Sequence, residues 1–181
     1  MLGLIAVGII LVDKAVKKAD ESRKQKQKAS LVRYTESMDP SPPAYLKLSR
    51  FIGSKEFGSP IHTSVPRNIR FIEVNCNRHI ESIKFITYSG DTYIFGFWKP
   101  VKDTYRVELA RDDQITKVTV RFGEHLNKIR FETKLAGQTK TMGNSIGGKQ
   151  IEVPIDQNRQ LAAIKGMYCE HISGIQFVMS M

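Results

Sequence analysis

The chain has 181 residues, which is enough for one domain with an appendage. Its formal net charge is +10, which favours acidic partners such as anionic lipid, nucleic acid or sulfated glycan, and which ordinary solubility also explains. Its two cysteines, Cys76 and Cys169, favour free thiols in a reducing compartment over a disulfide-bonded secreted scaffold, which usually carries more of them.

Residues 1–28 join an apolar segment to a basic one and predict a helix. Residues 1–12 are apolar without a break, but a bilayer span needs about 20 such residues. A membrane anchor of this kind would insert its apolar end and place its lysines at anionic headgroups. The residues assigned to membrane binding are Leu2, Leu4, Ile5, Ile9, Lys14, Lys17 and Lys18. The alternative is a helix that docks on a protein partner.

The location of the protein is read from the same segment. It lacks a basic start and a convincing cleavage site, so a cytoplasmic or peripheral membrane location is expected, with secretion left as an alternative. Residues 29–44 predict a linker, because Pro40, Pro42 and Pro43 stop a helix and stiffen the chain. Residues 45–181 then form one β domain.

A short pattern occurs three times in this domain, with a histidine, an aliphatic residue, an isoleucine at the fifth position and a phenylalanine at the seventh. The three copies begin at His79, His125 and His171, and the two spacings, 125 − 79 and 171 − 125, are both 46 residues. A fixed period with a matching apolar pattern indicates one structural unit built three times. Each histidine is expected to begin a strand that follows a tight turn.

Four alternating segments per unit predict a small antiparallel sheet. In the first two units, Gly96 and Gly143 each open a loop after the third strand. The third copy stops at Met181, so residues 45–65 are expected to complete its sheet and protect its edges. The predicted class is therefore all-β, with three four-stranded antiparallel sheets in pseudo-three-fold arrangement after an N-terminal helix. A β-trefoil is the alternative.

Residues 45–181 resemble the jacalin-related lectins. The resemblance rests on Phe131-Glu132-Thr133, a Gly-rich loop over residues 143–148, an apolar-x-apolar-Pro strand ending at Pro154, Ile164-Lys165-Gly166, and a final Ile-x-x-Ile strand from Ile172. The family has a β-prism fold and binds sugars, so the resemblance implies a lectin-like module with a glycan or glycoconjugate as its partner. A non-lectin protein- or membrane-interaction module on the same scaffold is the alternative.

The resemblance also places a sugar site between an early loop and a late loop. Here the early loop, residues 53–58, has no Gly-Gly pair, and the short late turn carries Glu170 where the family has Asp. A second candidate is the Gly-rich loop near Asn144. The residues assigned to carbohydrate binding are Gly53, Gly58, Tyr168, Glu170, Asn144, Gly147 and Gly148.

Three histidines invite a zinc site, but the repeat makes them equivalent scaffold positions, and no metal is expected unless their rings converge on the axis. No catalytic spacing of side chains stands out, so neither an enzyme nor a cofactor is expected. Basic and aromatic residues form no continuous stripe, which disfavours nucleic acid as a partner.

Overall fold

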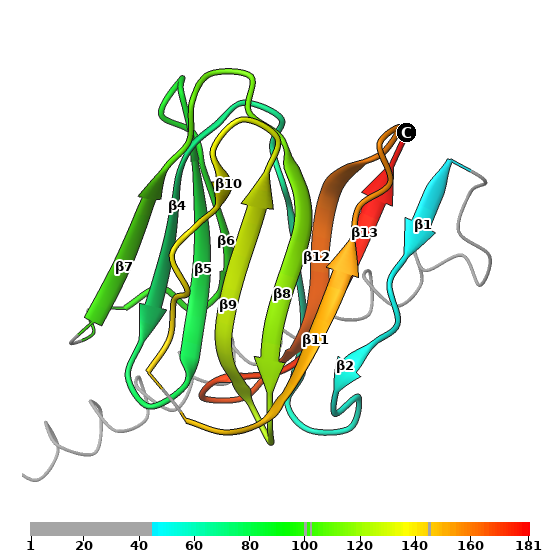
Figure 1. Ribbon diagram of the computed structural model, residues 1–181. Helices are drawn as coiled ribbons and strands as arrows, with labels where there is room; N and C mark the ends of the chain where they lie inside the picture. Colours follow the sequence, from blue (N-terminus) through cyan, green and yellow to red (C-terminus); the bar gives the residue numbers. More distant parts are fainter. Residues whose placement is uncertain (1–44, 100, 102, 145) are drawn as a thin grey trace, which may run out of the picture. The chain divides into compact units, whose positions relative to one another are not determined.

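The computed structural model describes residues 45–99, 101, 103–144 and 146–181, which form the β domain (Figure 1). The predicted anchor, residues 1–28, and the predicted linker, residues 29–44, lie outside these residues. Across the described part of the chain, no helix is long and apolar enough to cross a membrane.

The domain consists of three antiparallel sheets, as the repeat predicts (Figure 1). The first sheet has the order β6-β5-β4-β7 and comprises β4 (Ile69–Cys76), β5 (Ile80–Thr87), β6 (Thr92–Gly96) and β7 (Asp103–Glu108). The second has the order β10-β9-β8-β11 and comprises β8 (Ile115–Phe122), β9 (Leu126–Thr133), β10 (Gly137–Gln138) and β11 (Lys149–Pro154).

The third sheet is assembled from both ends of the domain. Its strands are β12 (Gln160–Tyr168), β13 (Ile172–Ser180), β1 (Leu46–Leu48), β2 (Ile52–Gly53) and β3 (Ser59–Ser64). β3 pairs with β12, while β1 and β2 both pair with β13. The predicted closure by residues 45–65 is confirmed. The outer strand is interrupted between β1 and β2, so this sheet fills four strand positions with five strands.

The three central hairpins repeat even their irregularities. In each, the strand before the histidine has two register shifts, one at its start and one just before the turn, and the shifts recur 46 residues apart. The second set lies between Asn75 and Cys76, between Arg121 and Phe122, and between Met167 and Tyr168. Bulges of this kind re-aim the strand that carries them. Because the same irregularity precedes each histidine, the three turns begin from equivalent positions of their hairpins.

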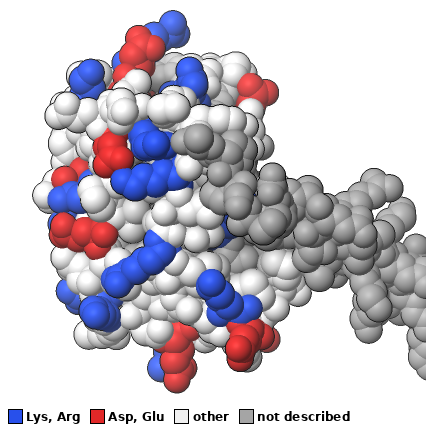
Figure 2. Space-filling view, turned by 90° about the vertical axis from the view of Figure 1, so that its right-hand side faces the viewer, with Lys and Arg blue, Asp and Glu red and all other residues white. Residues whose placement is uncertain are grey.

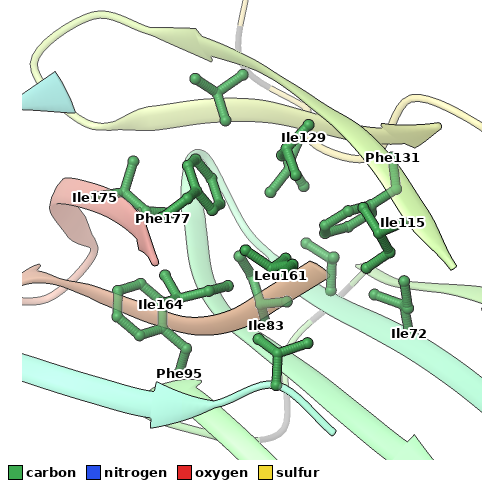
Figure 3. Close-up of a cluster of buried hydrophobic side chains, with 14 of the residues drawn as sticks. Ile72, Ile83, Phe95, Ile115, Ile129, Phe131, Leu161, Ile164, Ile175 and Phe177 are labelled. Atoms are coloured by element: carbon green, nitrogen blue, oxygen red, sulfur yellow. The ribbon is translucent and has the colours of Figure 1, made fainter. Parts of the chain in front are cut away.

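The core contains one set of side chains from each unit. Three repeat positions are fully buried in all three sheets, namely Ile72, Val118 and Ile164, then Ile83, Ile129 and Ile175, then Phe85, Phe131 and Phe177. Figure 3 shows the set formed by Ile83, Ile129 and Ile175 within this core. Along a strand, side chains two positions apart point to the same face, so Ile83 and Phe85, like Ile129 and Phe131, face the core together. Three sheets that meet through such faces form a β-prism, and this arrangement excludes the β-trefoil.

Two loop glycines are required by close backbone contacts. Gly96 and Gly143 have φ of 95° and 120°, and a Cβ at either would collide with the carbonyl oxygen of Glu81 or Asn127 respectively. Both conditions favour glycine over any other residue. The two loops that these glycines open therefore lie tight against the start of the histidine strands.

Basic and acidic side chains alternate over the face shown in Figure 2. In the described domain several basic and acidic side chains are paired, such as Lys47 with Asp156 at 2.8 Å and Lys117 with Glu132 at 2.8 Å. Such a mixed surface is typical of a soluble domain. On this face, the positive charge of the domain does not form a single continuous patch.

Candidate functional site

The three histidine turns lie together at one end of the prism, the lower end in Figure 1, with the loop between β2 and β3 beside them. They bring their rings to the pseudo-three-fold axis. The ring centres of His79 and His125 are 4.9 Å apart, those of His79 and His171 5.2 Å, and those of His125 and His171 5.3 Å. The prediction that the histidines hold equivalent positions is confirmed, and the structure adds that they touch.

The residue two positions after each histidine lies buried beneath this cluster. These residues are Glu81, Asn127 and Ser173. His79 Nδ1 lies 2.8 Å from Asn127 Oδ1, and His171 Nδ1 lies 4.0 Å from Glu81 Oε1. Each of these two histidines thus faces the acceptor of another unit. The Ser173 hydroxyl breaks the pattern because it donates to the Phe57 carbonyl, and His125 Nδ1 has no hydrogen-bond partner among the described residues.

The hydrogen bond from His79 defines its tautomer. Asn127 Oδ1 can only accept, while the amide nitrogen of Asn127 donates to the Gly147 carbonyl at 3.2 Å. His79 therefore donates from Nδ1, and in its neutral form it keeps a lone pair on Nε2. Nevertheless, among the described residues, no group of three or more His, Cys, Asp or Glu side chains is placed to hold a metal ion.

Two histidines of the cluster, His125 and His171, resist protonation. Burial lowers the pKa of His125 and of His171, and the neighbouring imidazoles lower both further. The unfolded chain then binds protons below about pH 6.5 that the folded chain does not. These groups therefore contribute stability that is present above about pH 6.5 and is lost as the pH falls from there towards their folded pKa values.

We expect the free energy of unfolding to fall between about pH 7.5 and pH 5.5, and the fall to be smaller in His125→Gln. Urea unfolding at both pH values measures this in a chelator-containing buffer. The control is Thr92→Gln at an exposed position of β6, which introduces a glutamine without removing a titratable group and should keep the parent's pH dependence. An equal slope in the parent and in His125→Gln would contradict the assignment.

A hollow of about 600 Å³ opens over the histidine cluster. Its walls combine an exposed aromatic ring, charged side chains and an isoleucine that is 91% exposed. The residues that line this end hollow are Phe57, Arg78, His79, Glu124, His125, Asn127, Ile146, Cys169, Glu170 and His171. They come from all three histidine turns, the β2–β3 loop and the Gly-rich loop.

The structure brings the early and late loops together, as the sequence predicts. A Cβ at Gly58 would lie 2.5 Å from the Tyr168 carbonyl oxygen, and β3 pairs with β12 at Ser59 and Tyr168. Gly53 packs on the Phe122 ring of the second sheet. Of the four residues predicted in these loops, Glu170 lines the end hollow, whereas Gly53, Gly58 and Tyr168 are not among its lining residues.

The second predicted set is used differently. The Asn144 side chain donates 2.7 Å to Asp103 and 3.0 Å to the Asn77 carbonyl, and it accepts from the Tyr105 hydroxyl. It joins the Gly-rich loop to the first sheet and does not line the end hollow. Gly148 packs on the Phe122 backbone, and the Gly147 carbonyl holds Asn127. This loop therefore contributes to the hollow through Ile146.

The sequence did not lead to the prediction that His79, His125 and His171 line the hollow together. The signal was present in the repeat itself, because equivalent residues near one end of a closed three-fold prism must meet at its axis. Phe57 and Ile146 had no such signal, since neither belongs to the repeat. Both cysteines, Cys76 and Cys169, are free thiols, as expected.

Comparison with known proteins agrees with this architecture. The Jacalin-like lectin domain family matches residues 50–178. A mannose-specific jacalin-related lectin from Morus Nigra, solved with mannose, is similar with a TM-score of 0.61 at 16% identity, covering 80% of this chain and 100% of that chain. The Calystegia sepium agglutinin gives a TM-score of 0.61 at 16% identity, covering 77% and 98%.

The Calsepa lectin in complex with a biantennary N-glycan gives a TM-score of 0.62 at 18% identity, covering 77% of this chain and 98% of that chain. At these identities the solved structures establish the shared fold. No curated protein sequence matches this chain. The family match spans more than half of the chain and the sheets have the arrangement that the family implies, so this protein belongs to the Jacalin-like lectin domain family.

Proposed function

We propose that this protein is a carbohydrate-binding module and that the end hollow is its sugar site. The observation that carries the proposal is the meeting of the β2–β3 loop with the β12–β13 turn around an open hollow in a jacalin-like fold. Two of the similar structures are described as complexes with mannose and with a biantennary N-glycan. Those ligands suggest where a search among sugars should begin.

The chemistry of the hollow suits a sugar. The Phe57 ring is 56% exposed and offers a face for the apolar side of a pyranose. Glu124, Glu170 and the imidazole Nε2 lone pair of His79 supply acceptors for sugar hydroxyls, while Arg78 supplies donors. A hollow of about 600 Å³ is within the range of small-ligand sites.

Titration calorimetry of the full chain with mannose, galactose and a biantennary N-glycan tests the proposal. We expect at least one to bind, and Phe57→Ala and Glu170→Gln each to weaken binding by about tenfold, the value of one lost contact of about 1.4 kcal/mol. The matched control is Tyr45→Ala, because Tyr45 is a similarly exposed aromatic residue that does not line the hollow. Absence of binding across a broad glycan array would sink the lectin function.

Tethering through residues 1–28 is part of the proposed function but stays a prediction from the sequence. It rests on the apolar start of the chain and on the lysines that follow it. Liposome recruitment that survives deletion of these residues would exclude the membrane anchor.

A further inference from the structure

The outer face of the second sheet holds three cations side by side. Arg121 on β8 lies directly opposite Lys128 on β9, and the neighbouring pair in the same register is Thr119 with Arg130. Like charges opposite one another across a β-ladder are destabilising. Neither Arg121 nor Lys128 forms an ion pair with any described residue. The fold therefore maintains an unfavourable arrangement that its described residues do not neutralise.

The third cation, Arg130, is also poorly satisfied. Its guanidinium lies 3.9 Å from Glu132, whose carboxylate is already held by Lys117 at 2.8 Å. Arg130 Nε and the hydroxyl of Thr119, which is 7% exposed, are both buried without a hydrogen-bond partner among the described residues. Leaving such groups unpaired costs free energy, so this part of the sheet is short of acceptors.

These groups surround a pocket of about 340 Å³, here called the cationic pocket. It is lined by Thr119, Arg121, Lys128, Ile129, Arg130, Thr141 and Gln150. No carboxylate is among these lining residues, whereas the cations come from two adjacent strands. The pocket thus presents cationic hydrogen-bond donors and no carboxylate, a combination that favours binding of an anion.

The first sheet shows what this arrangement lacks. The residues 46 positions before Thr119 and Arg130 are Glu73 and Lys84, which face each other in the same register and form an ion pair. Glu73 also pairs with Arg106 at 3.1 Å. The first sheet therefore supplies its own carboxylate, while the second has only a hydroxyl at that position. An external anion would occupy the place that the Glu73 carboxylate fills in the first sheet.

We propose that the cationic pocket binds a tetrahedral oxyanion, and that this oxyanion is the sulfate ester of a glycan. Arg121 and Lys128 flank the β8–β9 turn, and the same turn contributes Glu124 and His125 to the end hollow. An oligosaccharide seated in the hollow can extend across this turn and place a charged substituent in the pocket. The choice of a glycan as carrier rests on the proposed function; the oxyanion site does not.

The test installs the missing carboxylate instead of removing a residue. Thr119→Glu copies the first sheet and should neutralise Arg130 without unfolding the domain. The matched control is Thr92→Glu, which makes the same change of charge at an exposed position of β6 in the first sheet. Titration calorimetry of the full chain compares a sulfated oligosaccharide with its desulfated form at fixed ionic strength.

We expect the sulfated form to bind at least about tenfold more tightly, Thr119→Glu to abolish that preference, and Thr92→Glu to preserve it. Inorganic sulfate should compete with the sulfated oligosaccharide for binding. Competition by inorganic phosphate but not by sulfate would assign the oxyanion to a phosphate ester. Equal binding of both oligosaccharides, equal behaviour of the two variants, or competition that follows ionic strength alone would overturn the site.

Two further arms separate this proposal from the proposed function. Sulfate-dependent binding that Phe57→Ala leaves intact, together with no binding of neutral sugars, would support the cationic pocket while the sugar site fails. Binding of neutral sugars without a preference for the sulfated form would support the sugar site and overturn the cationic pocket. Binding to phosphoinositide vesicles that is lost in Thr119→Glu, with no binding of sulfated glycan, would overturn the glycan carrier.

Discussion

Phe131→Ala is expected to lower the free energy of unfolding by about 3–5 kcal/mol, the usual cost of removing a fully buried aromatic ring. Phe131 is completely buried, and its ring meets that of Phe85 edge-on with the centres 6.3 Å apart. The same position in the third sheet is Phe177, also completely buried. Truncation at this layer removes one member of a ring of side chains to which all three sheets contribute.

Urea unfolding monitored by circular dichroism measures this cost. Phe97→Ala provides the control, because Phe97 is 61% exposed and a surface change usually stays within about 0.5 kcal/mol. The pseudo-symmetry predicts that Phe85→Ala and Phe177→Ala cost about as much as Phe131→Ala. A loss below about 1 kcal/mol for Phe131→Ala would show that the three sheets do not share this core.

Lys99→Met is expected to destabilise the protein more than Glu81→Gln, although both break the same ion pair. The Glu81 carboxylate is 1% exposed and lies 3.1 Å from the Lys99 ammonium, whose side chain is 42% exposed. This contact raises the pKa of Lys99. Removing the lysine leaves a buried charge without its counter-ion, whereas removing the charge of Glu81 returns the lysine to water.

We expect a loss of about 3 kcal/mol for Lys99→Met, the low end for a broken buried pair, because water reaches the lysine. Glu81→Gln should cost about 1 kcal/mol, since Asn77 still donates 2.6 Å to Oε1 and the exposed cation is rehydrated. The double variant Glu81→Gln/Lys99→Met completes the cycle and should cost less than the sum of the two single changes. A larger loss in Glu81→Gln than in Lys99→Met would contradict this asymmetry.

The repeat explains why so much of the fold could be predicted. Alternation marks a buried face, and the 46-residue period places Phe85, Phe131 and Phe177 at one depth of the core. The interrupted outer strand of the third sheet was not predicted, because the apolar pattern of residues 45–52 does not mark where β1 ends and β2 begins. β1 and β2 each pair separately with β13, and this pairing depends on the tertiary structure rather than on the local apolar pattern.

Less of the candidate sites than of the fold could be predicted from the sequence. Glu170 and the two loops near it could be placed from the resemblance, because the order of strands determines which loops share an end. Asn144 was predicted to bind sugar, but its side-chain amide donates to the Asn77 carbonyl and to Asp103 within the fold. Polar side chains of one type serve either structure or ligand, and only their neighbours distinguish the two.

Period and alternation are properties of a single chain, so they were sufficient to predict the number of sheets, the central hairpin of each and the equivalence of the three histidines. The folded domain was needed to show that the histidine rings meet at 4.9–5.3 Å, that Phe57 and Ile146 stand over them, and that Arg130 lacks the carboxylate that Lys84 has. These features depend on distances between units, which closure of the prism determines and which no local pattern encodes.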